Sequence, residues 1–265
     1  MTQILPASKP GCFCYLVNHS GPNSIDNCVK SLSLLQDNYL GYFPAPVVLF
    51  HEAGLTETMK NKLVARLKQP PTFVELAFSV PTHITAITPD WRIGYMHMCR
   101  FFAIDIFKQP ILTEFEYYCR LDTDSYIMSS AKEDIFKSAK FNNLNYGFID
   151  DSIIDQAEVT AGLWQTSQQF LDAHPDIKTY AKLYRDIQER HLYYTNFELC
   201  YLPWFRQDPW TSYADFIDKA GGIYAHRWGD HVIRYIGVRS FMPTQRIQRI
   251  TSIHYKHDII EANKL

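Results

Sequence analysis

Apolar runs and amphipathic stretches alternate along the first 80 residues, and this order constrains the fold more than any other feature of the sequence. The runs at 12–17, 47–50 and 72–78 have the length and composition of buried strands. Between them, 24–36 and 56–68 carry apolar residues at helical spacing. Strands that alternate with helices predict an α/β fold with a mostly parallel central sheet flanked by helices. In such sheets ligands bind beyond the carboxyl ends of the strands, so the residues after each strand are the first candidates for a site.

Beyond residue 90 the pattern continues with less regularity. The predicted helices span 94–107, 132–139, 166–190 and 213–219, and the third of these is expected to be interrupted near Pro175. The predicted strands span 115–121, 146–149, 223–226 and 232–238. No repeat or low-complexity linker interrupts the 265 residues, and a chain of this length can bury one large core. A single domain over residues 1–265 is therefore expected.

Two carboxylates separated by one residue follow the aromatic-rich strand predicted at 115–121. Asp122 and Asp124 would converge at the end of a buried strand, where they repel each other unless a cation lies between them. A hard divalent ion such as Mn²⁺ or Mg²⁺ accepts oxygen ligands and can also bridge a diphosphate. An Asp-x-Asp alone is weak evidence, because acidic residues at a strand end often cap a turn. The strand context favours the cation site.

The charge balance limits the partners of the chain. A formal net charge of −2 at pH 7 indicates no broadly basic surface, so nucleic acid is not an expected partner. A nucleotide diphosphate would need clustered arginines or a bridging cation. The proposed cation at Asp122 and Asp124 meets this need.

Cysteine usage and apolar run lengths bear on the compartment. None of the six cysteines forms a Cys-x-x-Cys pair, so a zinc site is not expected and buried free thiols are. The even number leaves disulfides open if the protein is exported. No apolar run approaches the roughly 20 residues that span a bilayer, and residues 1–6 lack the pattern of a signal peptide. A cytoplasmic protein without a transmembrane segment is expected.

Five segments, in one order, resemble those of a known enzyme family. They read YMHMCRF at 95–101, YYCRLDTD at 117–124, TNFE at 195–198, GGIYAHRWGD at 221–230 and IHY at 253–255. The corresponding family segments read YRHMCRF, YYWRVEPD, SNFE, GGFYYERWGD and YYH. The chain therefore resembles the fungal Golgi α-1,2-mannosyltransferases, with the first 90 residues matching only in their strand and helix pattern.

This resemblance implies a GT-A glycosyltransferase fold, a GDP-mannose donor and Mn²⁺. It also implies transfer of mannose to a carbohydrate or glycoconjugate acceptor, with retention at the anomeric carbon. The nucleotide-binding part would cover about 10–125, and the acceptor and catalytic part about 126–265. Retention requires either a carboxylate nucleophile or a same-face attack, and the sequence leaves both open.

The matched segments also suggest individual roles. The expected site consists of the metal ligands Asp122, Asp124 and His254, the catalytic carboxylate Glu198, and the donor-binding residues Arg100, Arg120, Trp228 and Asp230. Plain structural roles compete with several of these. Glu198 is also compatible with a helix cap or a pair to Arg206, Arg120 with a pair to a nearby acid, and Trp228 with a place in the core. Arg100 could equally be a surface charge on a helix.

Two departures from the family pattern affect the expected substrates. The family's Glu-Pro-Asp is Asp-Thr-Asp at 122–124, closer to the general GT-A metal motif. Residues 102–104 are apolar where the family tends to be polar and small, which weakens the case for acceptor contacts there. No segment matches the anchor and stem of the fungal enzymes, so the acceptor and cellular site need not be theirs. Asn18, His19 and Ser20 follow the first strand, where a nucleotide base would dock.

Three other functions compete with a mannosyltransferase. A GT-A transferase could use a UDP-sugar instead, since the base-binding region is the least matched. A non-catalytic sugar-binding relative would keep only the fold, and the retained acids argue against it. A haloacid-dehalogenase-type phosphatase also uses Asp-x-Asp, but Tyr126 occupies the place of its hydroxyl residue and Arg234 the place of its later acid.

Overall fold

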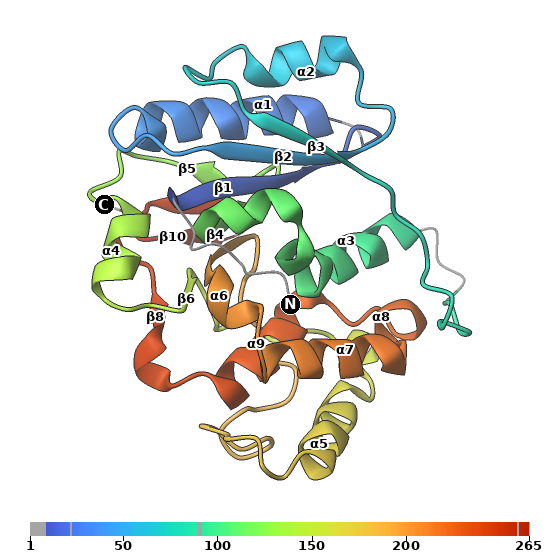
Figure 1. The fold of residues 1–265 in the computed structure, drawn as a ribbon. Helices are drawn as coiled ribbons and strands as arrows, with labels where there is room; N and C mark the ends of the chain where they lie inside the picture. Colours follow the sequence, from blue (N-terminus) through green and yellow to red (C-terminus); the bar gives the residue numbers. More distant parts are fainter. Residues whose placement is uncertain (1–8, 22, 89–91, 259, 265) are drawn as a thin grey trace.

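The computed structural model describes residues 9–21, 23–88, 92–258 and 260–264. A seven-stranded sheet lies at the centre, with helices packed on both sides of it (Figure 1). Its strands are β1 (Lys9–Val17), β2 (Val47–Glu52), β3 (Thr72–Leu76), β4 (Phe115–Leu121), β6 (Tyr146–Phe148), β7 (Phe197–Tyr201) and β8 (Ile247–Arg249). Their order across the sheet is β3-β2-β1-β4-β7-β6-β8.

The strand directions divide this sheet. The strands β3, β2, β1 and β4 run parallel to one another, whereas β7 is antiparallel to both β4 and β6. β8 again runs parallel to β6. The predicted α/β fold with a mostly parallel sheet is thus confirmed. A smaller antiparallel sheet joins β5 (Tyr126–Ile127), β9 (Tyr255–His257) and β10 (Ile260–Ala262), in the order β10-β9-β5.

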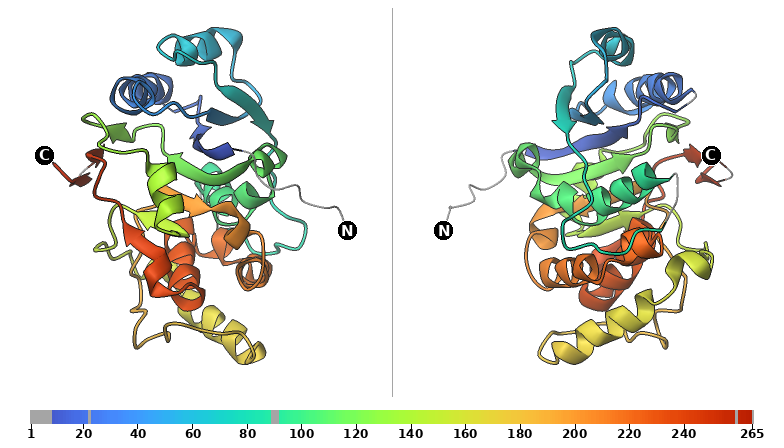
Figure 2. Two further views of the ribbon diagram at one scale, coloured as in Figure 1. Left: turned by 60° about the vertical axis from the view of Figure 1, so that its left-hand side comes forward. Right: turned by 90° about the vertical axis from the view of Figure 1, so that its right-hand side faces the viewer.

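Helices cover both faces of the large sheet (Figures 1 and 2). One face is covered by α1 (Ser24–Leu35), α2 (Glu57–Val64) and α4 (Ile135–Phe141). The other face is covered by α3 (Ile93–Ala103), α5 (Leu163–Ala173), α6 (Leu202–Phe205), α7 (Trp210–Ala220), α8 (Gly222–Ala225) and α9 (Asp230–Phe241). Short helical turns span Gln36–Leu40, Asp105–Lys108, Pro110–Glu114, Glu158–Thr160 and Thr244–Arg246.

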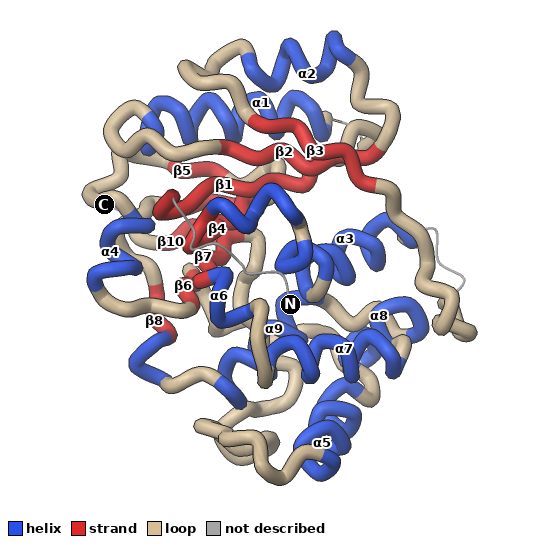
Figure 3. Tube along the Cα trace, in the orientation of Figure 1, coloured by secondary structure: helices blue, strands red, loops and turns tan. Residues whose placement is uncertain are grey.

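β1 shows why the central strands have continuous apolar sequences. Cys12 and Cys14 belong to the core on one face of the sheet, and Phe13 and Tyr15 to the core on the other. All four side chains are completely buried, because helices cover both faces. Figure 3 shows this three-layer arrangement, with the strands enclosed between two groups of helices.

Two predicted strands, at 223–226 and 232–238, are wrong, because these residues form α8 and α9. Gly221 adopts a left-handed conformation (φ 76°) that ends α7 and starts α8 within one residue. α9 is buried around most of its circumference, including Val232, Ile233, Ile236 and Val238. A helix buried on all sides lacks the alternation of apolar and polar faces by which the 3.6-residue helical period is recognised. Its β-branched residues then favour the prediction of a strand.

The helix predicted over 166–190 ends at Ala173, near the interruption expected at Pro175, but it does not resume after the proline, so the second part of the prediction is wrong. Pro175 disfavours helical geometry at the residue before it, and α5 ends there. The following segment instead forms turns and an isolated bridge between His191 and Ile154. This bridge places the residues that precede β7 beside the residues that follow β6. Both segments contribute to the site described below.

All six cysteines are buried free thiols, as the sequence predicted. The sulfur atoms of Cys12 and Cys14 are 3.7 Å apart, which confirms that the two side chains share one face of β1. Among the described residues, no helix has the length and apolar character needed to cross a bilayer. The signal-peptide expectation for residues 1–6 lies outside the described residues.

The packing of α4 on β1 depends on a glycine. A Cβ atom at Gly11 would lie 2.2 Å from Cδ1 of Phe136, and the Phe136 ring also packs edge-on against Phe13. We therefore expect Gly11→Ala to lower the free energy of unfolding by about 1–3 kcal/mol, measured by urea denaturation. Gly94→Ala is the matched control, because nothing lies within 4 Å of a Cβ atom in that helical position. It should stabilise the protein by about 0.5–1 kcal/mol, and equal losses in both variants would contradict the packing argument.

Candidate active site

A cavity of about 180 Å³ lies beyond the carboxyl end of β4, the edge at which parallel sheets bind ligands. Five segments line it: α3, the end of β4, the two segments on either side of the His191 bridge, and the start of α9. The lining residues are Tyr95, Met98, Arg120, Asp122, Ile153, Leu192, Tyr194, Thr195, Asn196, Asp230 and His231. Three of the predicted site residues, Arg120, Asp122 and Asp230, are among them.

The antiparallel pairing of β4 and β7 brings two distant motifs together. Leu121 at the end of β4 lies opposite Phe197 at the start of β7. The residues after Leu121 therefore lie beside those before Phe197. The backbone N–H of Asp122 donates to the carbonyl of Asn196 at 3.1 Å, and Asn196 Nδ2 donates to Asp122 Oδ2 at 2.7 Å. Asn196 was part of a matched segment but was not predicted as a site residue.

Arg120 holds two carboxylates from different elements. Its Nε donates to Asp122 Oδ1 at 2.7 Å and its Nη1 to Asp230 Oδ2 at 2.6 Å. The guanidinium carbon lies 3.5 Å from the centroid of the Phe102 ring, and the side chain is 2% exposed. Burial alone would lower the pKa of Arg120, but the charges of Asp122 and Asp230 raise it well above its ordinary value. The arginine is therefore a fixed positive charge.

Asp230 is the buried partner in this arrangement. Burial acts to raise its pKa, but the charge of Arg120, together with His231 and a hydrogen bond from Thr195, holds the pKa below its usual value. Thr195 Oγ1 donates to Asp230 Oδ2 at 2.8 Å. Asp230 begins α9, where a negative charge is also favoured by the helix dipole.

Asp124 lies at the open end of the same network and binds a histidine that the sequence analysis missed. His257 Nε2 lies 3.0 Å from Asp124 Oδ1 and 3.2 Å from Asn196 Nδ2, while its Nδ1 lies 2.6 Å from the Tyr194 hydroxyl. The hydrogen bond from His257 lowers the pKa of Asp124. Burial acts to lower the pKa of His257, but the bond to Asp124 and the nearby acids raise it. Asp124 is 47% exposed against 23% for Asp122, so it is the more accessible carboxylate.

The structure does not bring the predicted metal ligand His254 to the acid pair. Its Nε2 pairs with Glu261 Oε1 at 2.9 Å. The reason is the register of the small sheet, in which Lys256 of β9 lies opposite Tyr126 of β5. Side chains alternate along a strand, so Tyr255 and His257 face the segment that follows Asp124, while residue 254 precedes the strand. The sequence does carry a signal for His257, the Tyr-x-His spacing at 255–257. Its histidine lies two residues beyond the matched segment 253–255.

Glu198 does not line the cavity either. Its carboxylate is completely buried and accepts from Tyr118 at 2.5 Å, from Tyr146 at 3.3 Å and from Arg234 Nε at 2.9 Å. The Arg234 guanidinium is in turn enclosed by the rings of Phe107, Phe205 and Trp210. The alternative pair with Arg206 is not formed either, since Arg206 Nε donates to the carbonyl of Phe107. With both oxygens enclosed in the core, Glu198 is placed as a structural ion-pair partner and not as a carboxylate beside a sugar.

Two predicted donor-binding residues also have structural partners. Arg100 donates through Nε to Asp218 at 2.8 Å and through Nη1 to Asp105 at 2.5 Å, which ties α3 to α7. Trp228 is 3% exposed, and its Nε1 donates to the carbonyl of Ala161 at 2.8 Å. Its ring occupies the space that a Cβ at Gly222 would take, at 2.2 Å. Both side chains are held by neighbouring elements, and neither lines the cavity.

The loop after β1 is a turn at the same edge of the sheet. Asn18 Oδ1 accepts hydrogen bonds from the backbone N–H of Ser20 at 3.0 Å and from its hydroxyl at 2.9 Å. The His19 ring packs close to Gly54, which follows β2. The loop is thus well defined by local contacts, and its role in docking a base stays a prediction.

The chemistry of the site suits a divalent cation that arrives with a ligand. Within the described ranges, no group of three or more His, Cys, Asp and Glu side chains is arranged to hold a metal by itself. Asp124 and His257 nevertheless place an oxygen and a nitrogen side by side, and Asp122 is joined to them through Asn196. Carboxylate oxygen with imidazole nitrogen fits Mn²⁺, whose remaining positions phosphate oxygens and water can fill.

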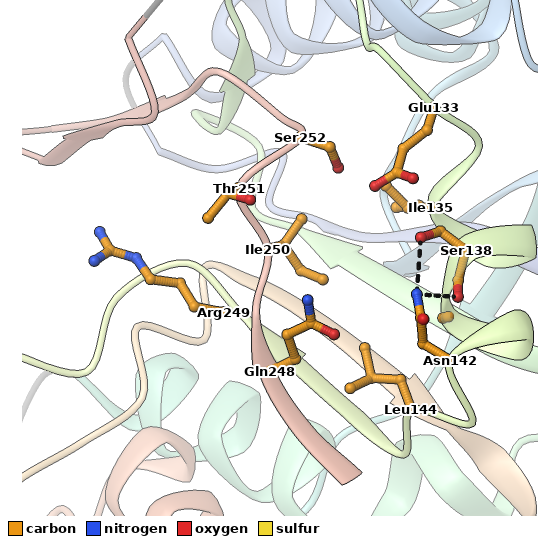
Figure 4. A pocket seen from close by; sticks show the side chains of 11 residues that line it. Glu133, Ile135, Ser138, Asn142, Leu144, Gln248, Arg249, Ile250, Thr251 and Ser252 are labelled. Atoms are coloured by element: carbon orange, nitrogen blue, oxygen red, sulfur yellow. Dashed lines mark hydrogen bonds between the residues drawn. The ribbon is translucent and has the colours of Figure 1, made fainter. Parts of the chain in front are cut away.

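A second pocket, between α4 and residues 248–252, has a different character (Figure 4). Glu133, Ser138 and Asn142 face it on one side, and Asn142 donates back to the Ser138 carbonyl at 3.0 Å. Its volume of about 30 Å³ is enough for a water molecule but not for a sugar or nucleotide. It contains none of the predicted site residues.

A parallel half-sheet that ends in Asp-x-Asp beside a cavity, and continues into an antiparallel strand, defines the GT-A class of glycosyltransferase folds. The chain belongs to the glycolipid 2-alpha-mannosyltransferase family, whose sequence pattern matches residues 7–262. The resemblance inferred from five short segments is therefore confirmed for both family and fold.

Individual relatives agree with this assignment. The probable mannosyltransferase KTR3 of Saccharomyces cerevisiae is 27% identical over 255 residues, which cover 87% of this chain and 63% of that protein. The O-glycoside alpha-1,2-mannosyltransferase homolog 2 of Schizosaccharomyces pombe is 26% identical over 258 residues, which cover 86% of this chain and 68% of that protein. The chain thus spans about two thirds of the length of these two relatives.

A solved structure gives the same fold. Core-mannan synthase A (CmsA/Ktr4) of Aspergillus fumigatus, in a Mn/GDP form, matches with a TM-score of 0.87 and 21% sequence identity, over 96% of this chain and 76% of that chain. At this identity the match establishes the fold and leaves the ligands of this chain to its own residues.

The buried pair of Glu198 and Arg234 generates a prediction that separates structure from catalysis. Glu198→Ala leaves the Arg234 charge in a fully buried position without its carboxylate, and should lower the free energy of unfolding by about 3–5 kcal/mol in urea denaturation. A double variant, Glu198→Leu with Arg234→Met, removes both charges and should recover most of this loss. A Glu198→Ala protein of unchanged stability would contradict the structural role.

Proposed function

We propose that this chain is a metal-dependent glycosyltransferase that transfers mannose from GDP-mannose to a hydroxyl group of a saccharide acceptor. The observation that carries the proposal is the connected set Asp122, Asn196, His257 and Asp124 at the end of β4, beside a cavity of about 180 Å³. The names of the family and its relatives support mannose as the sugar. The Mn/GDP form of the related fungal structure supports the nucleotide and the metal.

Each residue of the set has a distinct task in this proposal. Asp124 and His257 would hold a Mn²⁺ or Mg²⁺ ion, together with Asp122, whose carboxylate is already oriented by Arg120 and Asn196. When bound, such an ion neutralises the charge that develops on the departing diphosphate. Arg120 holds Asp122 and Asp230 in place through hydrogen bonds, and its charge favours the charged form of Asp230. Asp230 would accept hydrogen bonds from sugar hydroxyls at the wall of the cavity.

The enclosure of Glu198 bears on the route to retention. A covalent intermediate needs a carboxylate that can reach the anomeric carbon, and both Glu198 oxygens are engaged inside the core. We therefore favour the same-face route. In that route the acceptor oxygen bonds to the anomeric carbon on the side from which the diphosphate leaves, and the acceptor proton passes to a departing phosphate oxygen.

The donor is tested by thermal unfolding with GDP-mannose, GDP-fucose and UDP-sugars, each with Mn²⁺ or EDTA. A nucleotide at 100 times its Kd should raise the melting temperature by roughly 5–10 °C, since it binds only the folded protein. We expect the guanine nucleotides to give this rise only with metal. Mn²⁺-dependent hydrolysis of GDP-mannose separates an enzyme from a sugar-binding relative. A rise with UDP-sugars alone would assign a different donor.

The histidine assignment has a matched control in the same segment of the chain. Asp124→Ala and His257→Ala should each raise the Mn²⁺ concentration needed for the GDP-dependent shift by at least about tenfold. His254→Ala should leave it unchanged, because His254 pairs with Glu261 outside the cavity. The opposite ranking of the two histidines would restore His254 as the ligand, and a shift that survives Asp124→Ala would remove the acid pair from the site.

A further inference from the structure

A histidine–carboxylate pair that the proposed function does not use forms part of the cavity wall. His231 Nε2 lies 2.8 Å from Asp155 Oδ2. Both side chains are mostly buried, at 19% and 18% exposed. His231 lines the same cavity as Arg120, Asp122 and Asp230. The pair therefore joins the candidate active site to the segment that follows β6.

The surrounding structure holds this pair in one arrangement. A Cβ at Gly229 would lie 2.0 Å from Cε1 of His231, so the imidazole ring fills the space that only glycine leaves open. The backbone N–H of Asp155 donates to the carbonyl of Arg190 at 2.9 Å, which fixes the carboxylate relative to the approach to β7. Burial acts to raise the pKa of Asp155, but the hydrogen bond from His231 lowers it, so the carboxylate keeps its charge.

The geometry of α9 separates His231 from the metal-binding side. Asp230 faces Arg120, and consecutive helical residues differ in direction by roughly 100° about the helix axis. His231 is therefore turned away from the Arg120 and Asp122 pair and toward Asp155, while it still lines the cavity. The cavity of about 180 Å³ is smaller than the roughly 300–1,000 Å³ typical of sites for larger ligands. A site of this size can receive part of each substrate and cannot enclose a whole donor or acceptor, so Asp230 and His231 can serve different sugar rings at different parts of its wall.

The chemistry of the pair matches a sugar hydroxyl. With Nε2 held by the carboxylate, Nδ1 is the ring nitrogen left to exchange a hydrogen bond with a hydroxyl group, which can both donate and accept. In the same cavity, Tyr95, Ile153 and Leu192 offer apolar surface for the C–H face of a pyranose ring. A polar group of fixed direction beside apolar walls is the usual composition of a site that orients a small polar ligand.

We propose that His231 binds a hydroxyl group of the saccharide acceptor and that Asp155 is the positioning residue that orients the imidazole ring. This inference rests on the proposed glycosyltransferase function and specifies the acceptor side of the same site. The acceptor class it implies is a saccharide that offers one ring to the cavity, with a free hydroxyl directed at His231.

The test compares acceptor and donor kinetics in matched variants, with methyl α-D-mannoside as the acceptor probe. His231→Phe should raise the acceptor KM about tenfold, as expected for one lost hydrogen bond. In the same variant, the donor KM and the rate of Mn²⁺-dependent GDP-mannose hydrolysis should each change by less than about twofold. His231→Gln keeps an acceptor atom and should recover part of the loss. Asp155→Ala should raise the acceptor KM in the same direction, because the ring loses its partner.

The control is His254→Phe, which breaks a histidine–carboxylate pair of the same composition outside the cavity and should leave both KM values unchanged. An unchanged acceptor KM in His231→Phe, or an equal rise of donor and acceptor KM, would overturn the proposal. If wild-type protein shows neither GDP-dependent stabilisation nor hydrolysis, the proposed function itself fails. Saturation-transfer NMR of methyl α-D-mannoside then tests the His231 subsite without catalysis. A signal in the wild-type protein that is lost in His231→Phe supports the subsite. Equal signals in the two proteins, or no signal in the wild-type protein, reject it.

Discussion

The buried guanidinium of Arg120 is the interaction on which the candidate site depends. It joins the end of β4 to the start of α9 through Asp122 and Asp230, which lie 108 positions apart in the sequence. A buried charge is tolerated only where its partners are well placed, so this contact fixes the direction of three side chains at once. The cavity takes its charged wall from these groups, and Asn196 and Thr195 attach the approach to β7 to the same two carboxylates.

A second buried arginine repeats the arrangement one helical turn further along α9. Arg120 and Glu198 lie opposite each other on neighbouring strands, roughly 5 Å apart. Asp230 and Arg234 lie four residues apart on α9, a rise of about 6 Å along the helix. Asp230 of the helix therefore pairs with Arg120 of the sheet. Arg234 of the helix pairs with Glu198 of the sheet. Two complementary ion pairs at matched spacing determine both the rotation and the axial position of α9, and this in turn places Asp230 and His231 in the cavity.

The corrections to the predicted site have one physical origin. Glu198, Arg100 and Trp228 belong to matched segments, but each is held by a contact with an element far along the chain: Arg234, Asp218 and Ala161 respectively. His257 was missed because its position depends on the pairing of β9 with β5, a two-residue strand that carries no strong pattern of its own. A motif identifies which segments come to a site. The contacts that each segment makes with distant elements of the chain then decide which of its side chains face the ligand.

The sequence by itself determined the α/β class, the mostly parallel sheet, the family, and the place of Asp122 and Asp124 after a buried strand. These follow from local periodicity, from strand length and from short segments whose order is visible in one dimension. Only the tertiary structure decided that β7 runs antiparallel to β4, that α9 is a helix, and that Asp155 meets His231 across the cavity. The reason is that strand direction, burial on all sides of a helix and the pairing of buried charges are set by contacts between distant residues, and local sequence carries no record of them.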